Sequence, residues 1–153
     1  MYQRILVPVD GSVTSQMALK EVARFAQLCP NAAIRLIHVV DVTQSTVGIT
    51  EFASNVPSLT EMEDAFKKSG QDALDRAAEE AKELGFSPEA VLVNVYSKQI
   101  AAAIVEDAQS WNADLIIMGT HGYTGLTHLL VGSVAEGVIR HAPVPILLVR
   151  AKA

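Results

Sequence analysis

Short apolar runs alternate with amphipathic segments along the whole chain, and this alternation limits the folds that the chain can adopt. Five apolar runs have the length of buried strands, at residues 4–9, 34–40, 89–95, 115–118 and 145–149. Four segments between them carry apolar residues every three or four positions, at residues 12–28, 60–84, 100–111 and 133–140. Strands that alternate with helices predict an α/β fold: a doubly wound, open, five-stranded parallel sheet with helices on both faces.

Local signals predict where several of these elements end. Ser12 follows the first apolar run and predicts a helix N-cap, and Gly85 is placed to close the second helix. Pro8 cannot donate a ladder hydrogen bond, so we expect it at the very end of the first strand. Residues 41–60 lose the apolar period and are rich in Thr, Ser, Gly, Asn and Pro, which indicates an unusually long connection.

The composition excludes several classes of protein. The chain of 153 residues has a formal net charge of −5, which argues against a protein that binds nucleic-acid phosphates. Its one cysteine, Cys29, excludes an internal disulfide, and we expect it to be a small core residue. No apolar run approaches the roughly 18 residues that span a membrane. We predict one soluble cytoplasmic domain over residues 1–153, with no nucleic-acid partner and no membrane span.

A glycine-rich segment follows the fourth predicted strand, at residues 119–125, and Gly132 and Ser133 then precede the last helix. Glycines allow a ligand to approach the backbone, and the free N–H groups of a helix start favour phosphate. A second polar segment, residues 10–12, follows the first strand. Ligands of doubly wound sheets bind at carboxyl ends of strands where the strand order reverses. The two segments therefore predict one anion-binding crevice if the first and fourth strands are neighbours.

The sequence resembles the universal stress protein family over nearly its whole length. The resemblance rests on residues 5–12 (ILVPVDGS), 36–40 (LIHVV), 114–122 (DLIIMGTHG) and 132–149 (GSVAEGVIRHAPVPILLV). ATP-binding members carry Gly, two residues, Gly, nine residues, Gly, then Ser or Thr. Gly119, Gly122, Gly132 and Ser133 match this motif with both spacings intact. The resemblance implies strand order 3-2-1-4-5, which makes the first and fourth strands neighbours.

The resemblance also implies a role for each residue of the site. Asp10 would reach the ribose hydroxyls or a phosphate-bound Mg²⁺ ion, and the backbone around Val39 would meet the adenine edge of ATP or another adenine nucleotide. Gly119 would lie against the ribose. The other implied contacts are Pro8, Val9 and Met118 near the base, and Gly122, Gly132, Ser133 and Val134 at the phosphates. The family commonly forms a homodimer through the fifth strand, here Ile146–Val149.

Several residues keep a second interpretation. The glycines could serve only a tight turn and close packing, and Asp10 could simply cap the first helix. His121 could contact a phosphate or metal, or could be an exposed loop residue. His38 lies within an apolar strand, which favours a hydrogen-bonded core residue. Trp111 is expected in the core or at its edge.

The residues between Gly119 and Ser133 favour nucleotide binding over catalysis. No Lys or Arg lies between Gly119 and Ser133, whereas an NTPase uses a cation to stabilise the transferring phosphoryl group. We therefore expect a nucleotide-dependent regulatory or stress-response protein with slow or no ATP hydrolysis, working with an unknown protein partner. The alternative is a nucleotide-free dimeric scaffold that acts through protein contacts. A dinucleotide oxidoreductase is disfavoured because the glycines do not form GxGxxG after the first strand.

Overall fold

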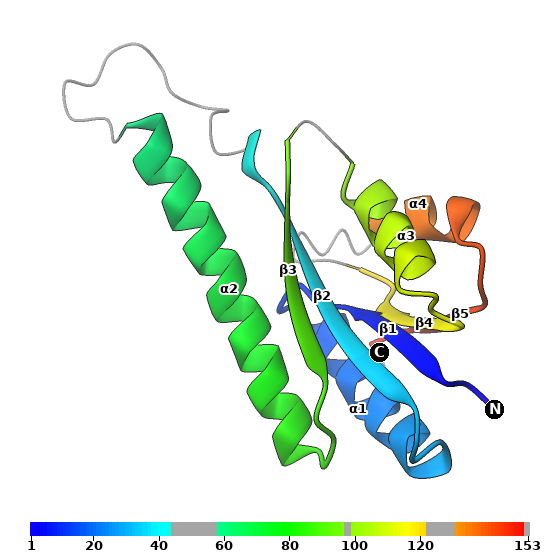
Figure 1. Ribbon diagram of the computed structural model, residues 1–153. Helices are drawn as coiled ribbons and strands as arrows, with labels where there is room; N and C mark the ends of the chain where they lie inside the picture. Colours follow the sequence, from blue (N-terminus) through cyan, green and yellow to red (C-terminus); the bar gives the residue numbers. More distant parts are fainter. Residues whose placement is uncertain (44–57, 97–98, 122–130, 152–153) are drawn as a thin grey trace.

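The alternation of strands and helices predicted from the sequence is present in the computed structural model, which describes residues 1–43, 58–96, 99–121 and 131–151 (Figure 1). The strands are β1 (Arg4–Pro8), β2 (Ala33–Asp41), β3 (Glu89–Val95), β4 (Leu115–Gly119) and β5 (Ile146–Val149). The helices are α1 (Val13–Leu28), α2 (Leu59–Glu83), α3 (Ile100–Ser110) and α4 (Ser133–His141). Each end agrees with the prediction to within a residue. Most of the predicted connection over residues 41–60 lies outside the described residues.

The five strands form one parallel sheet in the order β3-β2-β1-β4-β5, as predicted. Strand β1 lies in the middle and pairs with both β2 and β4, with Ile5 opposite Ile34 on one side and Leu115 on the other. The strand order therefore reverses at β1. The carboxyl ends of β1 and β4 are neighbours, which is the arrangement that the predicted crevice requires.

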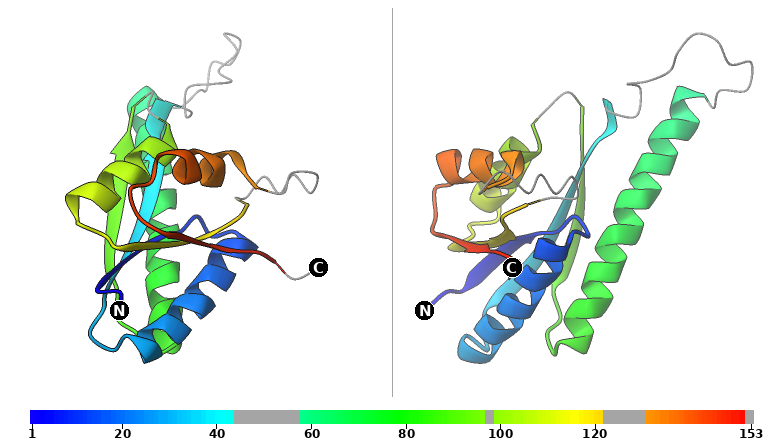
Figure 2. Two further views of the ribbon diagram at one scale, coloured as in Figure 1. Left: turned by 90° about the vertical axis from the view of Figure 1, so that its right-hand side faces the viewer. Right: turned by 180° about the vertical axis from the view of Figure 1, so that it is seen from behind.

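Helices cover both faces of the sheet (Figures 1 and 2). Alternate residues of the strands point to opposite faces, so the strands contribute side chains to two apolar cores, one on each face of the sheet. Ile5 and Leu36 pack toward α1 and α2, whereas Leu6, Ile37 and Ile116 pack toward α3 and α4. Both faces of the central strands are buried, and this explains their continuous apolar runs. Within the described residues, no helix is long and apolar enough to cross a membrane.

The local signals act as the sequence predicts. Ser12 caps α1, because its Oγ accepts a hydrogen bond from the backbone N–H of Ser15 at 3.2 Å. Pro8 is the last residue of β1, and the next residue, Val9, donates its N–H to the carbonyl of Ile37 at 2.9 Å. Gly85 follows α2 with φ at +92°, a conformation that favours glycine.

Two further residues, Cys29 and Trp111, have the environments expected of them. Cys29 is buried at the end of α1. Trp111 is half-buried at the end of α3, at the edge of the core, where the Arg35 guanidinium lies 4.6 Å from its ring centre. His141 is exposed at the last turn of α4, where its Nδ1 bonds the carbonyl of Gly137 at 2.9 Å.

Candidate functional site

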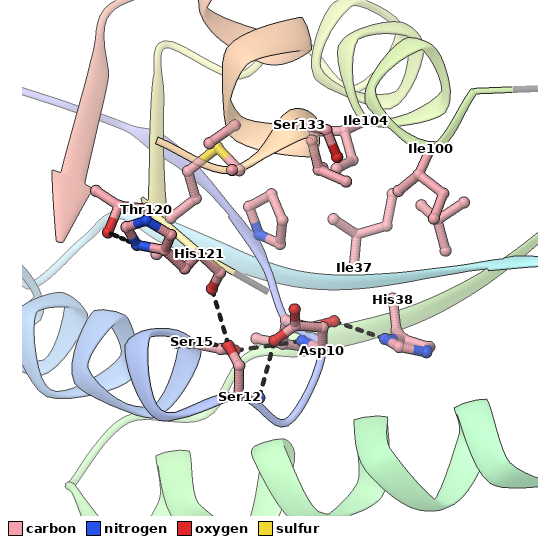
Figure 3. A pocket seen from close by; sticks show the side chains of 18 residues that line it. Asp10, Ser12, Ser15, Ile37, His38, Ile100, Ile104, Thr120, His121 and Ser133 are labelled. Carbon is pink, nitrogen blue, oxygen red and sulfur yellow. Dashed lines mark hydrogen bonds between the residues drawn. The ribbon is translucent and has the colours of Figure 1, made fainter. Parts of the chain in front are cut away.

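A cavity of about 470 Å³ opens at the carboxyl ends of β1, β2 and β4 and is bounded by α3 and α4 (Figure 3). Ten of the eleven residues proposed from the sequence line it: Pro8, Val9, Asp10, Val39, Met118, Gly119, His121, Gly132, Ser133 and Val134. Gly122 lies outside the described residues. The remaining lining residues are Ser12, Ser15, Ile37, His38, Ile100, Ile104, Thr120 and Ala135.

One end of the cavity is apolar. Ile37 and Val39 contribute from β2, and Ile100 and Ile104 enter from α3, so the end is walled by two different elements (Figure 3). Met118 comes from β4. The sequence identifies Ile100 and Ile104 only as the apolar stripe of a helix. A slot with aliphatic walls suits a flat, largely apolar ring.

The opposite end of the cavity is polar and is built on the segments after β1 and β4. Oδ1 of Asp10 accepts the N–H of Ser12 at 2.9 Å, but Ser12 and not Asp10 is the N-cap of α1. Ser12 Oγ donates to the carbonyl of His121 at 3.2 Å, and the Thr14 hydroxyl donates to the same carbonyl. These two hydrogen bonds connect His121 to the start of α1. They place the backbone of His121 beside Asp10.

The amino end of α4 faces this polar region. Gly132 is the N-cap of α4, and its N–H donates to the carbonyl of Thr120 at 2.7 Å. A glycine cap has no side chain that could bond the first N–H groups of the helix. Ser133 and Val134, the first two helical residues, line the cavity. A helix start that opens on a cavity provides N–H donors and a positive dipole end for an anion.

Gly119 has a packing function that the sequence leaves as one of two interpretations. A Cβ atom built on Gly119 would lie 2.4 Å from Thr14 Oγ1 and 2.7 Å from the Thr14 carbonyl carbon. Real Cβ atoms do not approach so closely, so a side chain here would force α1 away from β4. Close packing therefore explains this glycine, and its contact with a ribose stays a prediction.

The charge of the site is low. Among the described lining residues, with histidines neutral, only Asp10 carries a formal charge. The described residues contain no group of three or more His, Cys, Asp or Glu side chains that could hold a metal ion. An anion in this cavity would therefore meet backbone N–H groups and the Ser133 hydroxyl. A metal ion could take at most one carboxylate from the lining described.

Comparison with known proteins places the chain in a family. The model of the "Universal stress protein family" matches residues 1–150. Universal stress protein MJ0531 of Methanocaldococcus jannaschii is 36% identical over 154 residues, covering 98% of this chain and 83% of that protein. MJ0577 of the same organism is 30% identical, covering 99% and 97%. The solved structure of MJ0577 matches this fold with a TM-score of 0.81 at 32% identity, covering 99% and 98%.

Two more distant solved structures share the fold and contain nucleotides. One is a universal stress protein in complex with cAMP, with a TM-score of 0.63 at 23% identity. The other is the universal stress protein from Archaeoglobus fulgidus in complex with dAMP, with a TM-score of 0.64 at 21% identity. Each of these matches covers 97% of this chain, with coverage of 97% and 98% of the respective neighbours. From its family match, its relatives and its fold, this chain belongs to the universal stress protein family.

Proposed function

We propose that the cavity binds an adenine nucleotide, with ATP as the first ligand to test, and that the protein is a nucleotide-dependent regulator of a stress response. The observation that carries the proposal is the continuity of the cavity. A single cavity of about 470 Å³ joins the aliphatic end, lined by Ile37, Ile100 and Ile104, to the amino end of α4. The carboxylate of Asp10 lines the same cavity. This volume falls within the usual range for small-molecule sites, ~300–1,000 Å³.

The apolar end fits the base of such a ligand. Ile37, Ile100 and Ile104 can cover the faces of a purine ring, and Val39 places the end of β2 beside its edge. The complexes of the two fold neighbours with cAMP and dAMP support an adenine base as the group to be tested. In this proposal, Pro8, Val9 and Met118 pack around the base and Asp10 reaches the ribose hydroxyls or a phosphate-bound ion.

The polar end fits the phosphates. Ser133 can donate its hydroxyl, and the N–H groups of Ser133 and Val134 belong to the first turn of α4, where no intrahelical acceptor exists. Gly122 and Gly132 complete the glycine motif. Mg²⁺ commonly binds one or two carboxylates together with nucleotide phosphates and water, and Asp10 is the carboxylate available here.

The first prediction concerns the charge at the start of α4. Ser133→Asp places a carboxylate where the phosphates would bind, so ATP affinity with Mg²⁺ should fall about tenfold or more through like-charge repulsion. The same substitution should leave the free energy of unfolding unchanged or raise it by about 0.5 kcal/mol, because acidic residues favour a helix start. Isothermal titration measures the first quantity, and urea unfolding the second.

The matched control for this variant is Ser58→Asp. Ser58 caps the exposed start of α2, and Asp is an equally good cap residue. The substitution therefore adds the same charge to a helix start that does not line the cavity. Its ATP affinity should equal that of the unchanged protein. If the unchanged protein gives no heat with millimolar ATP and Mg²⁺, the nucleotide-free scaffold becomes the better proposal.

The second prediction concerns turnover. The described lining offers no Lys or Arg, and the sequence from Gly119 to Ser133 contains none, so charge on a transferring phosphoryl group would be poorly stabilised. Groups that bind ground and transition states equally do not accelerate the reaction. We expect ATP hydrolysis with Mg²⁺ to be far slower than the ~1–10³ s⁻¹ of typical enzymes. Phosphate release by the purified protein measures this rate, and a turnover within that range would contradict the proposal.

We also propose a homodimer through β5, the edge strand beside β4. Val149 accepts a hydrogen bond from Thr120 N–H at 3.0 Å, so the peptide groups of Ile146 and Leu148 point to the outer edge. All four residues of β5 are apolar and only half-buried. A second copy of the strand could pair with this edge and cover it.

The third prediction tests this edge. Leu148→Pro removes the outward N–H of residue 148 and leaves the bonds to β4 in place, so the protein should sediment as a monomer where the unchanged protein sediments as a dimer. Leu148→Val is the control, because it keeps the N–H and an apolar side chain. A monomeric unchanged protein at micromolar concentration would remove the dimer from the proposal.

A further inference from the structure

The peptide group between Val9 and Asp10 is the first one beyond the β1 ladder. The N–H of Val9 donates to the carbonyl of Ile37 at 2.9 Å, and β1 has ended one residue earlier, at Pro8. The next peptide consists of the Val9 carbonyl and the Asp10 N–H. Val9 is almost completely buried, so the polar groups of this peptide need partners from the protein.

Two side chains provide those partners. His38 Nδ1 lies 2.6 Å from the Val9 carbonyl oxygen, and Asp10 N–H donates to Ser15 Oγ at 3.3 Å (Figure 3). A carbonyl can only accept, so the ring nitrogen Nδ1 of His38 must carry the hydrogen. One peptide plane is thus held from both sides, by an imidazole of β2 and a hydroxyl of α1. The carboxylate that lines the cavity is attached to this plane.

The imidazole of His38 lies against α2. A Cβ atom built on Gly70, in the middle of α2, would lie 3.1 Å from His38 Cδ2 and 2.4 Å from Val40 Cγ2. A larger residue at position 70 would therefore push α2 away from the ring. Gly70 is buried, and so is Ser15 in the first turn of α1. Helices α1 and α2 thus both contribute to the position of Asp10.

We propose that His38 and Ser15 are positioning residues that hold the Val9–Asp10 peptide and thereby aim the Asp10 carboxylate at the nucleotide. This inference rests on the proposed function, because it assigns the two residues to the same site. Neither residue needs to touch the ligand. The peptide is correctly oriented only when β2, α1 and α2 are all in place, so the site is sensitive to α2 although α2 does not line the cavity.

The test is a double-mutant cycle measured by titration with ATP and Mg²⁺. His38→Leu keeps the bulk of the ring and removes the donor, and Asp10→Ala removes the carboxylate. Each variant should weaken binding about tenfold, the usual effect of one lost hydrogen bond to a charged group. Because His38 acts through Asp10, the double variant should bind as weakly as Asp10→Ala alone. Losses that multiply to about a hundredfold would overturn the inference.

Two variants separate positioning from general damage. His38→Asn places an amide donor where Nδ1 lies and should restore binding to within about threefold of the unchanged protein. If it binds no better than His38→Leu, the hydrogen bond is not the cause and the inference fails. His141→Leu is the matched control, because His141 also bonds a backbone carbonyl but lies exposed at the far end of α4. Its affinity should not change.

A readout without ligand keeps the inference independent of nucleotide binding. Hydrogen exchange of the Asp10 amide should become about tenfold faster in His38→Leu and in Ser15→Ala, because each frees one side of the peptide. Amides in the middle of β1 should keep their rates, which shows that the fold is intact. Unchanged exchange at Asp10 overturns the inference. If the unchanged protein binds no nucleotide but the two variants show this exchange pattern, only the proposed function is overturned.

Discussion

Gly119→Ala is expected to lower the free energy of unfolding by roughly 3 kcal/mol, at the upper end of what overpacking usually costs. The added Cβ would lie 2.4 Å from Thr14 Oγ1, 2.8 Å from Thr14 Cβ and 2.7 Å from its carbonyl carbon. Two of these three atoms cannot rotate away, so relief requires α1 to move from β4. Urea unfolding of the variant and the unchanged protein measures the difference.

Gly85→Ala is the informative comparison for this variant. Gly85 has φ at +92° and nothing within 4 Å of a built Cβ, whereas Gly119 lies outside the positive-φ region and is crowded. Gly85→Ala should therefore cost only about 1 kcal/mol, from backbone strain alone. Adding Thr14→Ala to Gly119→Ala should recover little, since the Thr14 carbonyl carbon remains. Equal costs at the two glycines would contradict the packing explanation.

Gly137→Ala is expected to cost roughly 2 kcal/mol and to weaken nucleotide binding as well. A Cβ on Gly137 would lie 2.6 Å from Ala101 Cβ, at the contact between α4 and α3. Moving these helices apart shifts Ser133 at the start of α4 relative to Ile100 and Ile104, which line the other end of the cavity. Both the thermal unfolding midpoint and the affinity for ATP should therefore fall together.

The same contact offers a compensating change. Ala101→Gly combined with Gly137→Ala exchanges the two residues across the contact. The two helices together still contain one alanine and one glycine at these positions, so the summed helix propensity is unchanged. The double variant should regain most of the stability and affinity lost in Gly137→Ala, although Ala101→Gly alone should cost about 1 kcal/mol. A double variant as weak as Gly137→Ala would show that this contact does not set the cavity width.

The sequence was sufficient to predict the elements and the edge of the sheet, at the carboxyl ends of β1 and β4, where the cavity opens. Both faces of the central strands are buried, so the apolar runs have nearly the observed lengths. Asp10 and Gly119 were predicted from their position after such runs. The strand order came from the resemblance, because alternation alone does not fix which strands are neighbours.

Residues that enter the cavity from helix α3 and from the α2 face of the sheet could not be found in this way. Ile100 and Ile104 repeat with helical spacing, and that spacing is the same whether the apolar stripe faces a core or a ligand. His38 was expected in the core, and its bond to Val9 depends on a neighbour 29 positions away. Gly70 and Gly137 reveal their close contacts only once the helices are packed.

The hydrogen bond of 2.7 Å from Gly132 N–H to the Thr120 carbonyl has a consequence for how such a protein can diversify. It joins the two ends of the segment between them, so β4 and the start of α4 are linked directly as well as through that segment. The entropic cost of closing a loop rises only slowly with its length. Segments of different length or chemistry could therefore be exchanged here at a small cost in loop closure, but only those that keep Gly122 and its spacing to Gly132 would keep the proposed glycine motif.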